Sequence, residues 1–166
     1  DLKRTLKRSS KVSIAAASFS IYAYEALKEE LENIDELRFI FTSPTFHKER
    51  ASKEKREFFI PKLNRERSLF GSDFEVKLRN QLSQKAIARE CADWIRRKAC
   101  FKTNVSNGAL NGFLSVANDE GKYVYLPFNE FTTTELGCER GNNICPVSMR
   151  MPSPFADKYL ADFNEL

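Results

Sequence analysis

The N-terminal part of the chain changes its hydrophobic period twice, and this pattern limits the fold more than any other feature. Val12 to Phe19 is a short apolar run, typical of a strand covered on both faces. From Tyr22 to Ile34 the apolar residues recur at helical spacing, and Leu37 to Ser43 is a second apolar run that Pro44 ends. Strand, helix and strand in this order form a βαβ unit, so we expect the two strands to be parallel neighbours in one sheet.

A long helix is expected to begin near Ser72, because Ser72 and Glu75 have the spacing of a capping box. It extends over about seven turns to Lys98. Trp94 is expected to pack against the sheet, with stacking on a nucleic-acid base as the alternative. The apolar stripe expected to face the core consists of Phe74, Leu78, Leu82, Ala88, Cys91 and Ile95.

The last third of the chain predicts strands, a hairpin and a closing helix. The expected strands are Ala99 to Thr103, Leu110 to Ala117 and Lys122 to Phe128, and residues 118–121 form the turn between the last two. A helical turn is expected at Thr132 to Leu136. The closing helix starts at Ser153 and Pro154, and its expected apolar face consists of Phe155, Tyr159, Leu160 and Phe163. At 166 residues the chain has the length of one domain. We therefore expect a single α/β domain over residues 1–166, with a mixed central sheet and helices on both faces.

Positive charge is concentrated in the middle of the chain, although the net charge is only +4. Residues 45–70 hold eight basic and four acidic side chains, and residues 77–102 hold eight basic and two acidic ones. A polyanion such as DNA would bind such a surface. The alternative is a solvated surface whose charges pair with the acidic segments on either side. The candidate phosphate-binding residues are Lys48, Arg50, Lys53, Lys55, Arg56, Arg89, Arg96 and Arg97.

Several common chemistries find no support in the sequence. The chain has neither a P-loop nor a G-x-G-x-x-G motif, and its only histidine, His47, is more simply explained as an exposed loop residue than as a catalytic one. The four cysteines lack the spacing of a zinc site. We expect no metal and no cofactor, and we interpret the cysteines as reduced thiols of a cytoplasmic protein. Serines interrupt the run from Val12 to Ala26, so we predict neither a signal peptide nor a membrane span. Asp1 is expected to be a cut end.

Two stretches of the last third carry a resemblance to a known family. They read Leu110-Asn-Gly-Phe-Leu-Ser-Val116 and Pro127-Phe-Asn-Glu-Phe-Thr-Thr-Thr-Glu-Leu-Gly137. Together with the order of elements, they resemble a phospholipase D-like nuclease domain of the type found at the N-terminus of superfamily-two (Swi/Snf-like and DEAD-like) helicases. That family carries H-x-K on the first strand of the hairpin and G-S-x-N-F-T on or after the second. The end of the chain, from Asp157 to Leu166, is similar to the helix that leads those domains into the helicase core.

The catalytic positions of the family are substituted here. The resemblance places Asn111 where the family has its nucleophilic histidine, Phe113 where it has lysine, and Asn129 and Glu130 in the second motif, with Glu130 at its asparagine. Phosphodiester cleavage of this type needs an imidazole to attack phosphorus and an ammonium to stabilise the transition state. The resemblance therefore implies a catalytically inactive domain, with Asn111 and Glu130 on adjacent strands at one end of the sheet.

The implied partners are DNA, bound weakly and without sequence preference, and the rest of a larger helicase chain that would bind and hydrolyse ATP. One alternative is an active nuclease with an altered site built from Glu130, Asn129 and Lys122. A second alternative is a dimerisation or docking module, in which the partner is a second copy or another protein.

Overall fold

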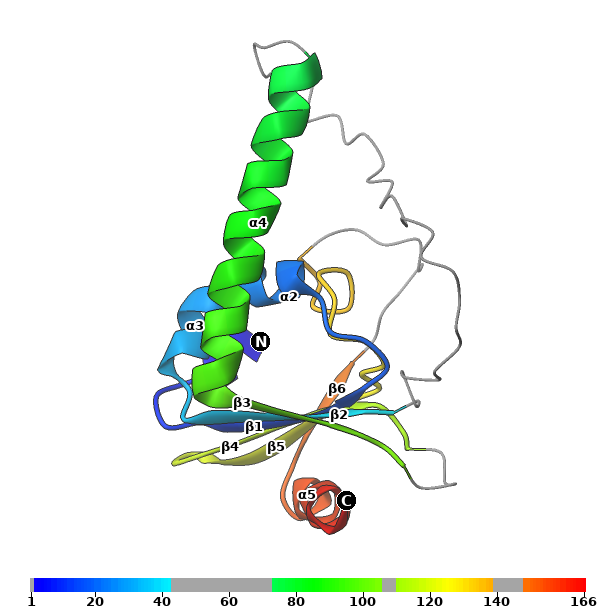
Figure 1. Ribbon diagram of the computed structural model, residues 1–166. Coiled ribbons are helices and arrows are strands. Elements are labelled where there is room, and N and C mark those ends of the chain that lie inside the picture. The colour runs from blue at the N-terminus through cyan, green and yellow to red at the C-terminus, as the bar shows by residue number, and fades with distance from the viewer. Residues whose placement is uncertain (1, 43–72, 106–109, 139–147) are drawn as a thin grey trace.

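The computed structural model describes residues 2–42, 73–105, 110–138 and 148–166. Its centre is one six-stranded sheet with the strand order β3-β2-β1-β4-β5-β6 (Figure 1). The strands are β1 (Lys11–Ala16), β2 (Glu36–Phe41), β3 (Ala99–Thr103), β4 (Phe113–Asn118), β5 (Gly121–Leu126) and β6 (Met149–Pro152).

The sheet is mixed, as the sequence predicts. β1 and β2 are parallel neighbours, with Val12 opposite Leu37, and β3 lies parallel to β2 on its other side. β4 runs antiparallel to β1, and β4 and β5 form the expected hairpin, in which Asn118 pairs with Gly121. β6, which the sequence did not predict, adds to β5 in antiparallel orientation and closes that end of the sheet.

Helices cover both faces of the sheet. α2 (Ile21–Ala26), α3 (Lys28–Asn33) and α4 (Asp73–Lys98) lie on one face, and α5 (Phe155–Glu165) lies on the other. A short α1 (Leu2–Thr5) precedes β1. The prediction of one helix from Tyr22 to Ile34 was wrong in its continuity, because Leu27 leaves helical geometry at φ −116° and ψ 14°. Leu27, Leu31 and Ile34 are nevertheless all buried, as their helical spacing predicts.

α4 has the predicted length and end, but only its C-terminal part packs against the rest of the domain (Figure 1). Cys91 and Trp94 are buried there and Ile95 is partly buried, whereas Ala88, predicted to face the core, is exposed. Burial of Trp94 confirms the packing interpretation and leaves no ring face for a base. Ser72 and the side chains of Phe74, Leu78 and Leu82 lie outside the part that the structure describes.

The two faces of the sheet have separate cores. The core on the side of α2, α3 and α4 includes Ile14, Leu37 and Phe39, and the core on the side of α5 includes Ala15, Ile40 and Phe113. This division follows the alternation of side chains along each strand. α5 contributes Ala156 and Phe163 to its core, while Phe155, predicted to be on the apolar face, is 61% exposed.

Candidate functional site

The catalytic positions of the resemblance meet at the open end of the β4–β5 hairpin. Asn111 lies just before β4, and Asn129 and Glu130 lie just after β5, and all three are exposed. The C-terminal ends of the parallel strands β1 and β2 lie at the same edge. In open α/β sheets, ligands bind preferentially outside the C-terminal ends of parallel strands. Asn111 and Glu130 thus lie at one end of the sheet, as expected, but just outside the strands rather than on them.

At this edge the segment after β5 crosses close to the backbone of the segment before β4. After β5 the chain passes over the start of β4, where the amide of Phe128 donates to the carbonyl of Gly112 at 3.2 Å. It then runs beside the end of β1, where the amide of Ala17 donates to the carbonyl of Asn129 at 2.8 Å. A Cβ atom on Gly112 would lie 2.3 Å from the Phe128 carbonyl oxygen, so this crossing requires glycine.

Glu135 orders the loop after β5, and it was not among the predicted site residues. The amide of Glu135 donates to Thr132 Oγ1 at 3.3 Å, and its carboxylate accepts a hydrogen bond from the amide of Asn129 at 3.2 Å. The helical turn predicted at Thr132 to Leu136 is present, with the amide of Leu136 bonded to the Thr132 carbonyl at 3.0 Å. The T-x-x-E spacing from Thr132 to Glu135 is the signal that could have identified this residue.

Phe113 is part of the hydrophobic core. Its side chain is 2% exposed, and its ring packs edge-on against Tyr159 and Phe163 of α5, with centroid distances of 5.3 and 5.9 Å. An apolar ring beneath a helix therefore occupies the position at which the resemblance expects a lysine. This residue has no access to a phosphate bound at the edge.

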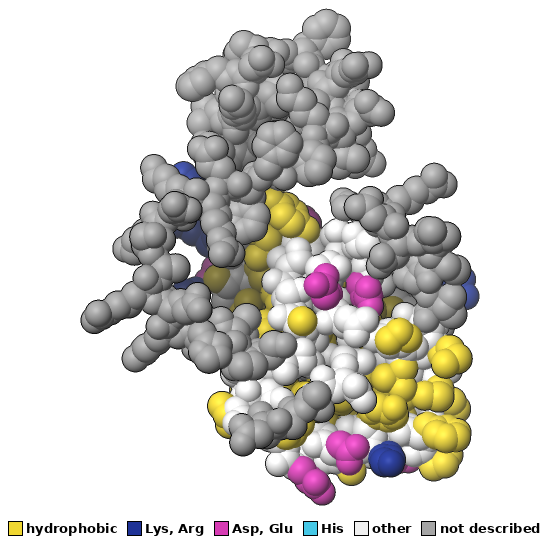
Figure 2. Space-filling model, turned by 90° about the vertical axis from the view of Figure 1, so that its right-hand side faces the viewer, with side chains coloured by type: hydrophobic (Ala, Val, Ile, Leu, Met, Phe, Trp, Pro, Cys, Tyr) yellow, Lys and Arg dark blue, Asp and Glu magenta, His cyan; other side chains and the backbone are white. Residues whose placement is uncertain are grey.

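The described surface at this edge is neutral to acidic. Figure 2 looks onto it and shows acidic side chains near the middle, with Lys and Arg only toward the margins. The chain's only imidazole, His47, lies outside the described residues. The described groups therefore offer carboxylates and amides, which can accept and donate hydrogen bonds but lack the nucleophile that the resemblance requires.

The basic candidates fall into two groups. Lys48, Arg50, Lys53, Lys55 and Arg56 lie outside the described residues. Arg89, Arg96 and Arg97 are exposed on α4. Arg89 and Arg96 are seven residues apart, so they lie on the same side of the helix.

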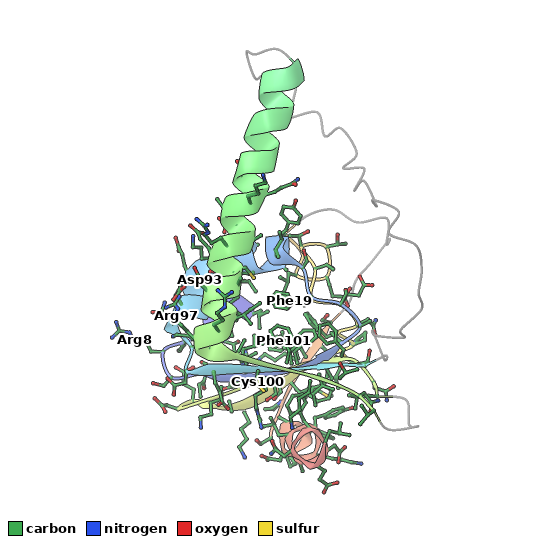
Figure 3. All side chains as sticks on the ribbon, viewed as in Figure 1. Arg8, Phe19, Asp93, Arg97, Cys100 and Phe101 are labelled. Atoms are coloured by element: carbon green, nitrogen blue, oxygen red, sulfur yellow. The ribbon has the colours of Figure 1, made fainter. Side chains whose placement is uncertain are left out.

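The three α4 arginines differ in their partners. Arg96 pairs with Asp93 one turn earlier, at 2.6 Å, whereas Arg97 reaches Glu32 of α3 at 3.1 Å. Figure 3 shows Asp93 and Arg97 together on α4. Within the described part of the chain Arg89 has no ion pair. Arg97 therefore contributes to the contact between α3 and α4, and Arg89 and Arg96 are the better candidates for an external anion.

Two lysines reinforce the contact between α3 and α4. Lys28 pairs with Glu90 at 2.5 Å, and this hydrogen bond raises the pKa of the Lys28 ammonium. The ammonium of Lys98 donates to the carbonyls of Glu32 and Ile34, both at 2.7 Å. Of the basic residues in 77–102, Arg97 pairs with the Glu32 carboxylate and Lys98 binds backbone carbonyls of the same segment, so both contribute to the contact between α3 and α4.

Three of the four cysteines are described. Cys91 is buried, Cys100 and Cys138 are exposed, and none of the three is in a disulfide. Among the described residues, no group of three or more His, Cys, Asp or Glu side chains could hold a metal ion. The helices in this part of the chain are all too short or too polar to cross a membrane.

Comparisons of the chain with protein-family models, with curated proteins and with solved structures find no match.

Proposed function

We propose that the chain is a non-catalytic phospholipase D-like domain that helps a larger DNA helicase or restriction-type ATPase to engage DNA. The main support for the absence of catalysis is the burial of Phe113 beneath Tyr159 and Phe163. A lysine placed there would have to lose the packing of an aromatic ring and bury an ammonium, which is costly without a partner.

The lack of a nucleophile supports the same conclusion. Asn111 has a neutral amide, which cannot attack phosphorus as an imidazole does. Glu130 is exposed at the same edge, and its carboxylate would repel the phosphate oxygens that the family's asparagine is positioned to meet. Loss of the nucleophile alone lowers such rates by several orders of magnitude.

DNA engagement is assigned to the outer side of α4. Arg89 and Arg96 are exposed there, and the only ion-pair partner of Arg96 in the described part of the chain is an exposed carboxylate on its own helix. Such a surface pair contributes roughly 0.3–0.5 kcal/mol, so a phosphate can replace Asp93 at low cost. Contacts of this kind position the DNA backbone without reading its sequence. ATP binding and hydrolysis would belong to the rest of the larger protein.

A second candidate function is dimerisation or docking, which the exposed apolar side chains at the β6 end of the sheet favour. Met149 on β6 is 59% exposed and Phe155 at the start of α5 is 61% exposed. Because β6 is the last strand of the sheet, its outer edge pairs with no strand of the described residues, and an edge of this kind can take a partner strand.

A cleavage assay separates the non-catalytic domain from an altered nuclease. Labelled single- and double-stranded DNA is incubated with the chain, with and without a chelator, and we expect no cleavage above background. Cleavage that is lost in Glu130→Gln would establish the altered nuclease instead. Light scattering tests the docking alternative, because a dimer that Met149→Ser dissociates would place a second copy at β6.

A further inference from the structure

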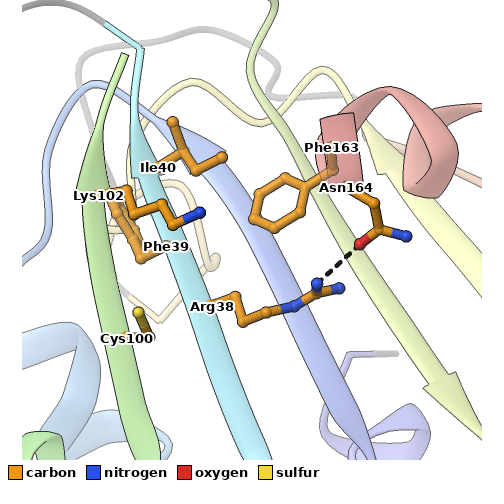
Figure 4. A pocket seen from close by; sticks show the side chains of 7 residues that line it. All are labelled: Arg38, Phe39, Ile40, Cys100, Lys102, Phe163 and Asn164. Carbon is orange, nitrogen blue, oxygen red and sulfur yellow. Dashed lines mark hydrogen bonds between the residues drawn. The ribbon is translucent and has the colours of Figure 1, made fainter. Parts of the chain in front are cut away.

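A small hollow lies on the α5 side of the sheet, where α5 leaves β2 and β3 uncovered. It has a volume of about 60 Å³, and Arg38, Cys100, Lys102, Phe163 and Asn164 are among the residues that line it (Figure 4). This volume exceeds the space that a single water needs, so the hollow has room for a group larger than one water. The hollow is on the opposite face of the sheet from α4, so a ligand bound in it would not depend on the proposed DNA surface.

Arg38 is held in a fixed orientation at this hollow. One terminal nitrogen of its guanidinium donates to Ser13 Oγ at 2.9 Å, and the other donates to Asn164 Oδ1 at 2.7 Å. Ser13 is buried, and the guanidinium also lies 5.1 Å from the centre of the Phe163 ring. Each terminal nitrogen carries two N–H groups, so one on each remains for a ligand. Ordering Arg38 in advance lowers the entropic cost of binding.

Two further donors belong to the same hollow. Lys102 is exposed on β3 and, among the described residues, takes part in no ion pair. Its partner across the strands is Ile40, two residues after Arg38, so Lys102 and Arg38 project from the same face of the sheet. Figure 4 shows both side chains on the side of the sheet that faces Phe163. Asn164 accepts the bond from Arg38 through its oxygen, and its amide nitrogen stays available as a donor.

The acid that pairs with Arg38 does not cancel this charge. Glu36 lies 3.6 Å from Arg38 Nε, whereas the two terminal nitrogens donate to Ser13 and Asn164. Glu36 does not line the hollow. Arg38 is thus partly neutralised by Glu36, whereas Lys102 has no ion pair within the described part of the chain.

We propose that this hollow binds the terminal phosphate of a phosphomonoester. A monoester is close to a dianion at neutral pH, and two cations and an amide donor match its charge and its three terminal oxygens. A structural role, in which Arg38 only fastens the C-terminal end of α5 to the sheet, accounts for Ser13, Asn164 and Phe163. It does not account for the position of Lys102.

The test is an NMR titration of the ¹⁵N-labelled chain. Methyl phosphate is the probe, dimethyl phosphate is the diester control, and sodium chloride at equal ionic strength is the salt control. We expect saturable shifts at the amides around Arg38, Lys102 and Asn164 with methyl phosphate, and at least about fivefold weaker binding of the diester, which carries a single charge. Lys102→Gln should weaken methyl phosphate binding by a similar factor. Lys158→Gln removes the same charge from an exposed position on α5 and should leave binding unchanged.

Arg38→Lys provides a second variant, because it keeps the charge but cannot bridge Ser13 and Asn164. It should weaken binding while far-UV and near-UV spectra stay native. Three results would overturn the proposal: shifts that chloride reproduces, a diester that binds as tightly as the monoester, or binding that Lys102→Gln leaves intact.

Discussion

The indole nitrogen of Trp94 on α4 donates a hydrogen bond to the backbone carbonyl of Leu31 on α3, at 3.1 Å. Both side chains are buried, and the Trp94 ring lies against Tyr24 with a centroid distance of 5.2 Å. The last carbonyls of a helix have no partner within it. The amide of Asp35, which would follow in the helix, bonds instead to the Ser10 carbonyl at 2.9 Å. Trp94 therefore completes the end of α3 and fastens α4 to it.

Trp94→Phe should lower the free energy of unfolding by about 1–3 kcal/mol, because the buried Leu31 carbonyl loses its donor. Urea unfolding followed by circular dichroism measures the change. Tyr22→Phe is the matched control: Tyr22 is an exposed aromatic residue on α2, and its variant should differ from the parent by less than about 0.5 kcal/mol. Equal stabilities of the two variants would contradict this account of the α3–α4 contact.

Gly112→Ala should destabilise the fold by about 1–3 kcal/mol, because the added Cβ would meet the Phe128 carbonyl at 2.3 Å. Thermal or urea unfolding measures this loss. Gly137 has φ +71°, and a Cβ added there would meet no atom within 4 Å. Gly137→Asn is therefore the control, since asparagine tolerates this backbone conformation and the change should cost little. A Gly112→Ala variant as stable as the parent would mean that the segment after β5 does not cross β4 as described.

Cys91 should resist alkylation in the folded chain at pH 8, while Cys100 and Cys138 react. Burial raises the pKa of the Cys91 thiol to about 11, so at pH 8 only about 0.1% of it is thiolate, the reactive form. Mass spectrometry after iodoacetamide treatment measures the labelling of each cysteine. Native labelling of Cys91 at the rate of Cys100 would contradict its place in the core.

The raised pKa of Cys91 also makes the free energy of unfolding depend on pH in the alkaline range. The folded pKa of Cys91 lies above the ordinary value of 9.0, so the unfolded chain loses this proton first as the pH rises. The contribution of Cys91 to stability is complete below pH 9 and falls as the pH rises toward 11. Cys91→Ala should remove this part of the pH dependence between those values, as urea unfolding at a series of pH values would measure.

The sheet centre could be predicted because its signals are local. The apolar run of β1, the helical period after Ser20 and the run of β2 dictate a parallel pair, and the turn at 118–121 dictates the hairpin. β6 could not be predicted in this way. Three of its four residues are exposed, so it has no alternation and owes its conformation to pairing with β5. The break in the helix at Leu27 could not be predicted either, because the helical spacing of the apolar residues continues across it.

The sequence was enough to predict where the candidate site lies, but not which of its side chains are buried or paired. The hairpin alone places Asn111 and Glu130 at one end of the sheet. The burial of Phe113 depends on where α5 docks, and that contact joins segments far apart in the chain. The pairing of Arg97 with Glu32 has the same origin. Charge counts along the sequence cannot separate an arginine that fastens two helices from one that is free to meet a phosphate.

The central claim is that DNA binds the outer side of α4, and fluorescence anisotropy of a labelled duplex measures it. If about four side chains contact phosphates, the log–log slope of affinity against salt should be roughly −3 to −4, with binding in the micromolar range or weaker at physiological salt. Arg89→Gln combined with Arg96→Gln should weaken binding equally for all sequences and flatten the slope by about 2. Arg97 is left unchanged because it pairs with Glu32.

The matched control combines Lys11→Gln with Lys158→Gln, which removes the same charge from exposed positions on β1 and α5. The account predicts that this control binds DNA with the slope of the parent chain, while the α4 variant does not. Absence of binding at low salt, or equal binding by the α4 variant and the parent, would contradict it.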